Sequence, residues 1–271
     1  MVVQEVDATG DCRIPQRISA EVKAGNCACE VRNPQGSCCL GNVTAVVKRL
    51  KADRISSEAT PAVVSDQTFQ HKTVAKLRLL SLIAILGAGI FAVAEVVQPF
   101  YRSDRTLSDP YSSYAVGQYG FVQTIAFLAL SAGSFALSFG LSRIGGSTVG
   151  LRLGRTLLAV WAFGVLVAAV FPIENGALPA SSEIHGLASM LSFLAIITAM
   201  FVLSMAFERQ VDWRSFARHS WVLAIVAGSS FLLGVVIHHS LCFAVLQRMF
   251  LGAVVLWICA TSARLRGLAP G

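Results

Sequence analysis

Few residues of this 271-residue chain have side chains suited to chemistry inside apolar surroundings, and most of these interrupt or end long apolar stretches. Ionisable groups at membrane depth are costly, so each one marks a candidate functional position. Under a topology of six membrane helices, their positions place them toward one membrane face. We therefore predict a protein that binds or transports a small molecule or lipid headgroup at one outward-facing polar site. Its candidate residues are Glu95, Glu174, His185, Gln247 and Arg248.

The types of these side chains limit the ligand. Arg248 carries a permanent, planar positive charge that suits a carboxylate or a phosphate. His185 adds a donor that changes charge near neutral pH. We expect a small anionic ligand, or a molecule such as a lipid with an anionic or hydroxyl-rich head. The alternative is that Arg248 pairs with Glu95 and binds nothing.

His185 also begins the sharpest local pattern. Ser189 and Ser192 follow it at spacings of four and three residues, so the three side chains share one helix face. A histidine there can carry a proton or ligate a metal. The spacing does not decide between these roles.

Two other classes of function stay open. A membrane enzyme would be a zinc hydrolase using His185, His238 and His239 with Asp109, or a haem protein with His185 and His238 as axial ligands. A structural or regulatory subunit would use its polar groups only for packing. The sequence contains no H-E-x-x-H, G-x-S-x-G or Walker motif. We therefore predict no metal site and no cofactor, and the sequence does not decide whether the protein is an enzyme.

Six apolar segments must position these residues. The chain is 55% hydrophobic and only 14% charged, which lies outside ordinary soluble composition. A bilayer core about 30 Å thick needs about 20 apolar residues per helix. We predict an all-α polytopic membrane protein, a bundle of six transmembrane helices. The segments are Leu79–Phe100, Gln118–Leu141, Leu153–Phe171, Ile184–Phe207, Phe216–Ile237 and Leu241–Ala263.

The distribution of Lys and Arg predicts the orientation. The net charge of +7 is spread around the apolar segments, and this spread argues against a nucleic-acid partner. Basic residues concentrate before the first segment, after the sixth, and in the second and fourth connections. By the positive-inside rule both termini are cytoplasmic, and we place the protein in the plasma (inner) membrane with the lipid bilayer as its partner.

Residues 1–70 differ from the rest, and residues 71–271 form the predicted six-helix domain. The N-terminal stretch is polar and without sustained periodicity, so we predict a poorly ordered cytoplasmic tail. Metal binding, redox sensing and disulfides are the alternatives for its five cysteines. These are Cys12, Cys27, Cys29, Cys38 and Cys39.

The second apolar segment carries a stripe of small and hydroxyl residues. Their spacings of three, four or seven put them on one helix face, and such faces let helices approach closely in lipid. We interpret this face as a packing interface, and a polar path for a substrate is the alternative. The residues are Gly120, Thr124, Ser131, Ser134 and Ser138.

Short motifs suggest a family. The turn Phe171-Pro172-Ile173-Glu174, the following His185-Gly186 and the late pair Gln247-Arg248 resemble a bacterial membrane family known only as domain of unknown function 998. The resemblance covers about residues 77–265. It implies six helices and no known activity. The family more often has Asp where this chain has Glu174.

The predicted orientation is testable with reporter fusions. Alkaline phosphatase fused after Asn175 is expected to be active, because this connection lies outside, and the same enzyme fused after Ser147 is expected to be inactive. Fluorescent-protein fusions at the two sites should give the opposite pattern. Activity of the same reporter at both sites would disprove the six-helix topology.

Overall fold

The structure, a computed structural model, describes residues 63–102, 104, 106, 109–143, 148–173, 179–237 and 240–268. At residues 63–73, 179, 240 and 241 it describes the backbone only. Most of the predicted N-terminal tail, Glu174, His238 and His239 therefore lie outside the described residues. The chain divides into two units, Met1–His71 and Lys72–Gly271, and the candidate membrane spans belong to the second.

The fold class predicted from the sequence is confirmed. Six helices are long and apolar enough to cross a membrane, and the described part of the chain contains no strand. In chain order the elements are α5 Val63–Tyr101, η1 Tyr111–Ala115, α6 Gly120–Leu141, α7 Val149–Val170, α8 Pro179–Glu208, η2 Val211–Trp213, α9 Arg214–Val236 and α10 Ser240–Gly267. Each predicted segment coincides with one long helix within a few residues, except that α5 begins well before Leu79. The predicted start at Leu79 marks only where the chain becomes apolar enough to enter lipid. The backbone hydrogen bonds of a helix can also form between polar residues, so α5 begins earlier.

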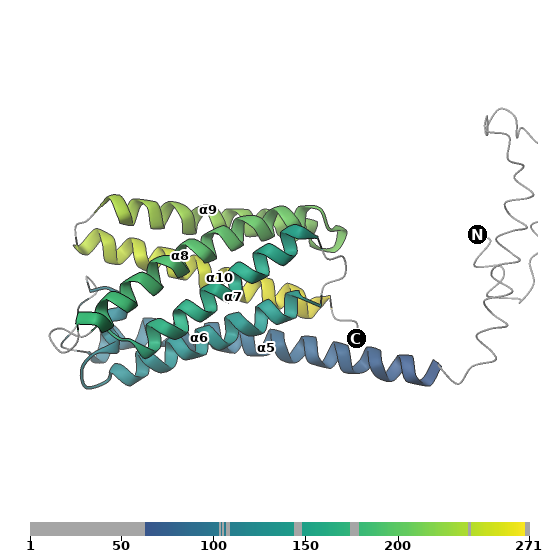
Figure 1. The fold of residues 1–271 in the computed structure, drawn as a ribbon, viewed down its shortest axis with the longest axis horizontal. Helices are drawn as coiled ribbons and strands as arrows, with labels where there is room; N and C mark the ends of the chain where they lie inside the picture. The colour runs from purple at the N-terminus through teal and green to yellow at the C-terminus, as the bar shows by residue number, and fades with distance from the viewer. Residues whose placement is uncertain are drawn as a thin grey trace, which may run out of the picture. The chain divides into compact units, whose positions relative to one another are not determined.

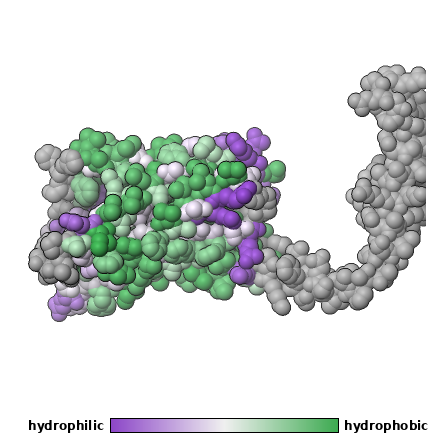
Figure 2. All heavy atoms as spheres, in the orientation of Figure 1, coloured by the Kyte–Doolittle hydropathy of each residue, from purple (hydrophilic) through white to green (hydrophobic). Residues whose placement is uncertain are grey.

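The helices lie side by side along the bundle (Figure 1). From α6 to α10 each long helix packs against the next one in the chain, and α10 also contacts α6. Apolar side chains cover the middle of the visible face, and polar side chains gather at its two ends (Figure 2). This pattern is typical of a bundle surrounded by hydrocarbon, with its connections in the polar interfaces.

Hydroxyl groups of α6 bind the backbone and side chains of α7. Ser131 Oγ donates to the Ala162 carbonyl at 2.7 Å, and Ser138 Oγ donates to the Arg155 carbonyl at 2.9 Å. Between them, Ser134 Oγ accepts the Trp161 indole N–H at 3.1 Å. The predicted packing interface is thus confirmed for these three serines, because each connects two helices where water is absent.

The contact between α5 and α6 depends on the absence of a side chain at Gly87. A Cβ atom there would lie 2.2 Å from the Ala129 carbonyl oxygen and 3.1 Å from the Gly133 Cα atom. The neighbouring Ala84 and Ala88 are fully buried. Small residues on both helices therefore bring the two backbones into direct contact.

This contact predicts that alanine substitutions at two glycines of α5 have different effects on the stability of the protein. Gly87→Ala is expected to destabilise the protein by about 1–3 kcal/mol, because the methyl group has no room between two backbones. Gly89→Ala is the matched control, since a Cβ atom there meets no atom within 4 Å. Thermal unfolding of both variants in detergent measures the difference. Equal unfolding temperatures would contradict this packing.

Candidate functional site

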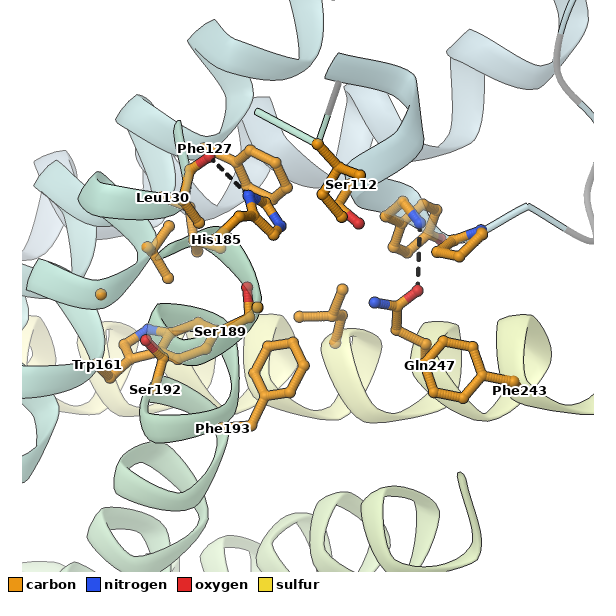
Figure 3. Close-up of a pocket in the computed structure, with 18 residues that line it drawn as sticks. Ser112, Phe127, Leu130, Trp161, His185, Ser189, Ser192, Phe193, Phe243 and Gln247 are labelled. Carbon is orange, nitrogen blue, oxygen red and sulfur yellow. Dashed lines mark hydrogen bonds between the residues drawn. The ribbon is translucent and has the colours of Figure 1, made fainter. Parts of the chain in front are cut away.

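A cavity of about 240 Å³ lies among η1, α6, α7, α8 and α10 (Figure 3). Most of its wall is apolar, including Phe127, Trp161 and Phe193. None of the described residues that line it is charged. Its polar side chains are those of Tyr111, Ser112, His185, Ser189, Ser192 and Gln247, together with the Trp161 indole.

His185 completes the end of α7. The helix ends at Val170, and its last carbonyl groups lack partners from within the helix. Position 172 is proline, which has no N–H to donate to the Ala168 carbonyl four residues earlier. His185 Nδ1 lies 3.2 Å from the Ala168 carbonyl oxygen and 2.8 Å from that of Phe171. The imidazole from α8 therefore caps the turn that the proline creates.

These two contacts determine which nitrogen carries the proton. A carbonyl oxygen only accepts hydrogen bonds, so Nδ1 must be the protonated donor. In the neutral ring, Nε2 then carries a lone pair, and this nitrogen points toward the open space of the cavity (Figure 3). His185 is 3% exposed. The site thus presents a fixed acceptor inside an apolar cavity.

Gln247 presents the complementary group. Its Oε1 accepts the backbone N–H of Tyr111 at 3.2 Å, so its amide nitrogen is free to point toward the cavity, as Figure 3 shows. The hydroxyl groups of Ser112 and Ser189 lie at the same space. An acceptor from α8 and a donor from α10 therefore converge on one cavity and suit a ligand with hydroxyl groups.

Arg248, next to Gln247, holds η1 from the side of α10. Its guanidinium donates to the carbonyls of Ala244 at 3.3 Å and Asp109 at 3.2 Å. Its Cζ atom lies 4.5 Å from the centre of the Tyr111 ring, a cation–π geometry. Burial raises the pKa of the Tyr111 phenol, so this ring stays uncharged at neutral pH. Arg248 thus lies behind Tyr111 and is not among the residues that line the cavity.

Arg102 holds η1 from the end of α5. Its buried guanidinium binds both Asp104 carboxylate oxygens at 2.7 Å, and it donates to the carbonyls of Tyr114 at 3.1 Å and Val116 at 2.6 Å. The bond to Asp104 raises the pKa of Arg102. Gly117 follows with a φ of +93°, and a Cβ atom there would lie 3.1 Å from Arg102 Nη2. Glycine is favoured at this turn because other residues rarely adopt this backbone conformation.

Glu95 belongs to a separate polar cluster between α5 and α6. Gln123 Nε2 donates to Glu95 Oε1 at 2.8 Å, and Gln98 Nε2 donates to Gln123 Oε1. Within the described part of the chain, Glu95 Oε2 and Gln98 Oε1 are buried without a hydrogen-bond partner. None of Glu95, Gln98 and Gln123 is among the residues that line the cavity.

The structure therefore divides the five predicted residues. His185 and Gln247 line one cavity, Glu95 and Arg248 do not line it, and Glu174 is outside the described residues. The polar partners Gln98, Arg102 and Gln123 are not among the residues predicted for the site. The amides within apolar segments and the Arg-x-Asp spacing after the first segment were signals that could have found them.

The residues named for a zinc or haem site are only partly described. Among the described side chains, no group of three or more His, Cys, Asp or Glu residues lies close enough to hold a metal ion. Asp109 lies instead in the turn before η1, where its Oδ2 accepts the Thr106 backbone N–H at 2.7 Å.

Comparison with known proteins identifies a family without identifying an activity. The model of the family described as "Protein of unknown function (DUF998)" matches residues 85–264. This match confirms the resemblance drawn from the turn at Phe171, His185-Gly186 and the Gln247-Arg248 pair. No curated protein and no solved structure matches the chain.

The guanidinium of Arg102 predicts how η1 responds to substitution. Arg102→Lys keeps the charge but loses the forked geometry that reaches Asp104 and two carbonyls together. Amide exchange in residues 111–117 is expected to accelerate about tenfold, because losing one or two hydrogen bonds costs about 1–3 kcal/mol. Hydrogen–deuterium exchange measures this rate. The exposed Arg152→Lys is the control, and unchanged exchange in Arg102→Lys would refute the clamp.

Proposed function

The chain belongs to the DUF998 family of proteins of unknown function, and we propose that it binds a molecule with an uncharged, hydroxyl-bearing head in the cavity beneath η1. The observation that carries this proposal is the pairing of groups across the cavity. The His185 Nε2 lone pair faces the amide nitrogen of Gln247, with hydroxyl groups of Ser112 and Ser189 between α8 and η1. Each hydroxyl group of a ligand can donate one hydrogen bond and accept two. It can therefore donate to His185 Nε2 and accept from the Gln247 amide.

The cavity supports an uncharged head better than an anionic one. The described lining residues provide no positive charge, and a buried anion without a partner costs several kcal/mol. Arg248, the cation expected from the sequence to bind an anion, is engaged with the Asp109 carbonyl and the Tyr111 ring. In this proposal Arg248 positions Tyr111 at the start of η1, while His185 and Gln247 contact the ligand.

We further propose that the cavity lies toward the outside of the plasma (inner) membrane, with both termini cytoplasmic. The support is the excess of Lys and Arg at the opposite ends of the helices. Arg143, Arg152, Arg209 and Arg266 are exposed there. The ligand would then be a molecule available in the outer half of the bilayer or at its surface.

Substitution of His185 tests the proposal. His185→Asn retains an N–H near the position of Nδ1, which still donates to the α7 carbonyls, but it removes the Nε2 acceptor. Binding of 1-octanoylglycerol to this variant is expected to weaken about tenfold, the effect of leaving one polar contact unmade at about 1–3 kcal/mol. Native mass spectrometry in detergent measures the dissociation constant, and the unfolding temperature should change little.

Two comparisons control this experiment. His219→Asn changes an exposed histidine of α9 that lines neither this cavity nor the space that adjoins it between α8, α9 and α10, and should leave binding unchanged. Octanoyl phosphate has the same chain with an anionic head and should bind more weakly than the glyceride. Stronger binding of the phosphate, or equal glyceride binding by the wild type and His185→Asn, would overturn the proposal. The first result would favour Arg248 as the ligand contact.

A further inference from the structure

A second cavity, of about 320 Å³, lies between α8, α9 and α10. It shares five lining residues with the first cavity, so the two adjoin. These are Gly186, Ser189, Phe193, Phe243 and Gln247. The remainder of its wall is almost entirely apolar and includes Phe231, Leu246 and Phe250.

The second cavity extends along the bilayer-spanning part of the bundle. Val235 and Phe243 lie near the ends of α9 and α10, whereas Phe250 lies ten residues inside α10. The lining residues of α10 run from Phe243 to Phe250, which at 1.5 Å per residue is about 10 Å, a third of the thickness of the hydrocarbon core. The cavity therefore extends along about a third of the hydrocarbon depth.

Its rim belongs to the lipid-facing surface. Met190 is 45% exposed and Val235 is 42% exposed, and both lie within the spans Ala180–Glu208 and Val211–Val236. At the junction of the two cavities, a Cβ atom on Gly186 would meet no atom within 4 Å. The rim of the second cavity therefore faces the surrounding lipid, and Gly186 leaves space where the two cavities adjoin.

We propose that the second cavity holds the acyl chain of a membrane lipid whose hydroxyl-bearing head occupies the first cavity, and that the lipid enters sideways between α8, α9 and α10. This inference rests on the proposed function, and it specifies the ligand class as an acyl lipid. The apolar wall matches a hydrocarbon chain, because Ser230 is the one polar side chain among the described lining residues that the first cavity does not share. The ligand's two parts thus follow the polarity of the two connected cavities.

Photocrosslinking in nanodiscs tests the position of the chain. The probe is a monoacylglycerol with an 18-carbon chain and a diazirine at mid-chain, and peptide mass spectrometry maps the labelled residues. Labelling is expected on the second-cavity residues Phe231, Leu246 and Phe250, and less on lipid-facing residues elsewhere. Excess unlabelled monoacylglycerol should remove this labelling.

Two leucine substitutions provide the matched pair. Gly186→Leu fills the junction and should reduce second-cavity labelling about tenfold, the effect of one badly fitting side chain. Gly252→Leu adds the same side chain at an exposed position of α10, where a Cβ atom also meets nothing within 4 Å, and should leave labelling unchanged. Normal unfolding temperatures for both variants show that folding is intact, and Gly186→Ala replaces Gly186→Leu if that variant misfolds.

The outcomes separate this inference from the proposed function. Even labelling of all lipid-facing residues, unchanged in the Gly186 variant, overturns the chain site. If His185→Asn still weakens binding of 1-octanoylglycerol in that case, the head site stands alone. If glyceride binding is also independent of His185, both proposals are wrong. Labelling confined to the second cavity and lost in Gly186→Leu supports the acyl-lipid site.

Discussion

The bilayer core offers no water to polar groups, so backbone hydrogen-bonding groups placed there must find partners within the protein. This constraint explains how the bundle is assembled. Serine hydroxyls of α6 reach backbone carbonyls of α7, and Ser220 of α9 accepts the Trp257 indole N–H of α10 at 2.7 Å while bonding Ser204 of α8 at 2.6 Å. Small residues such as Gly87 bring the backbones of α5 and α6 into direct contact.

The same constraint produces the candidate site. Pro172 ends α7 and deprives the Ala168 carbonyl of its helical partner, and His185 supplies the missing donor. Using Nδ1 for this purpose leaves Nε2 directed into the cavity. Gln247 behaves in the same way, because its oxygen serves the Tyr111 backbone and its nitrogen is left for the cavity. Structural hydrogen bonds thereby fix the orientation of the groups available to a ligand.

No charged side chain is among the described residues that line the cavity, and two arginines instead bind the segment that contains η1. Arg248 and Arg102 bind backbone carbonyls at the two ends of the segment that contains η1, and neither lines the cavity. Glu95 and its glutamine partners bond to one another between α5 and α6, and none of them lines the cavity. The two arginines thus hold the η1 segment in place without lining the cavity. A ligand in the cavity therefore does not have to displace a buried charge from its partners.

The sequence by itself determined the six helices, because about 20 apolar residues can satisfy a 30 Å hydrocarbon core only as a helix. It also marked His185 and Gln247, since polar groups in such segments are rare. The sequence could not show that Gln247 lines the cavity and that Arg248 does not. Gln247 and Arg248 are adjacent, but successive helix residues project about 100° apart, and only the packing of α5, η1 and α10 decides what each one contacts. No sequence pattern predicts the second cavity. It is the space that α8, α9 and α10 leave between them, and only their packing in the folded protein shows it.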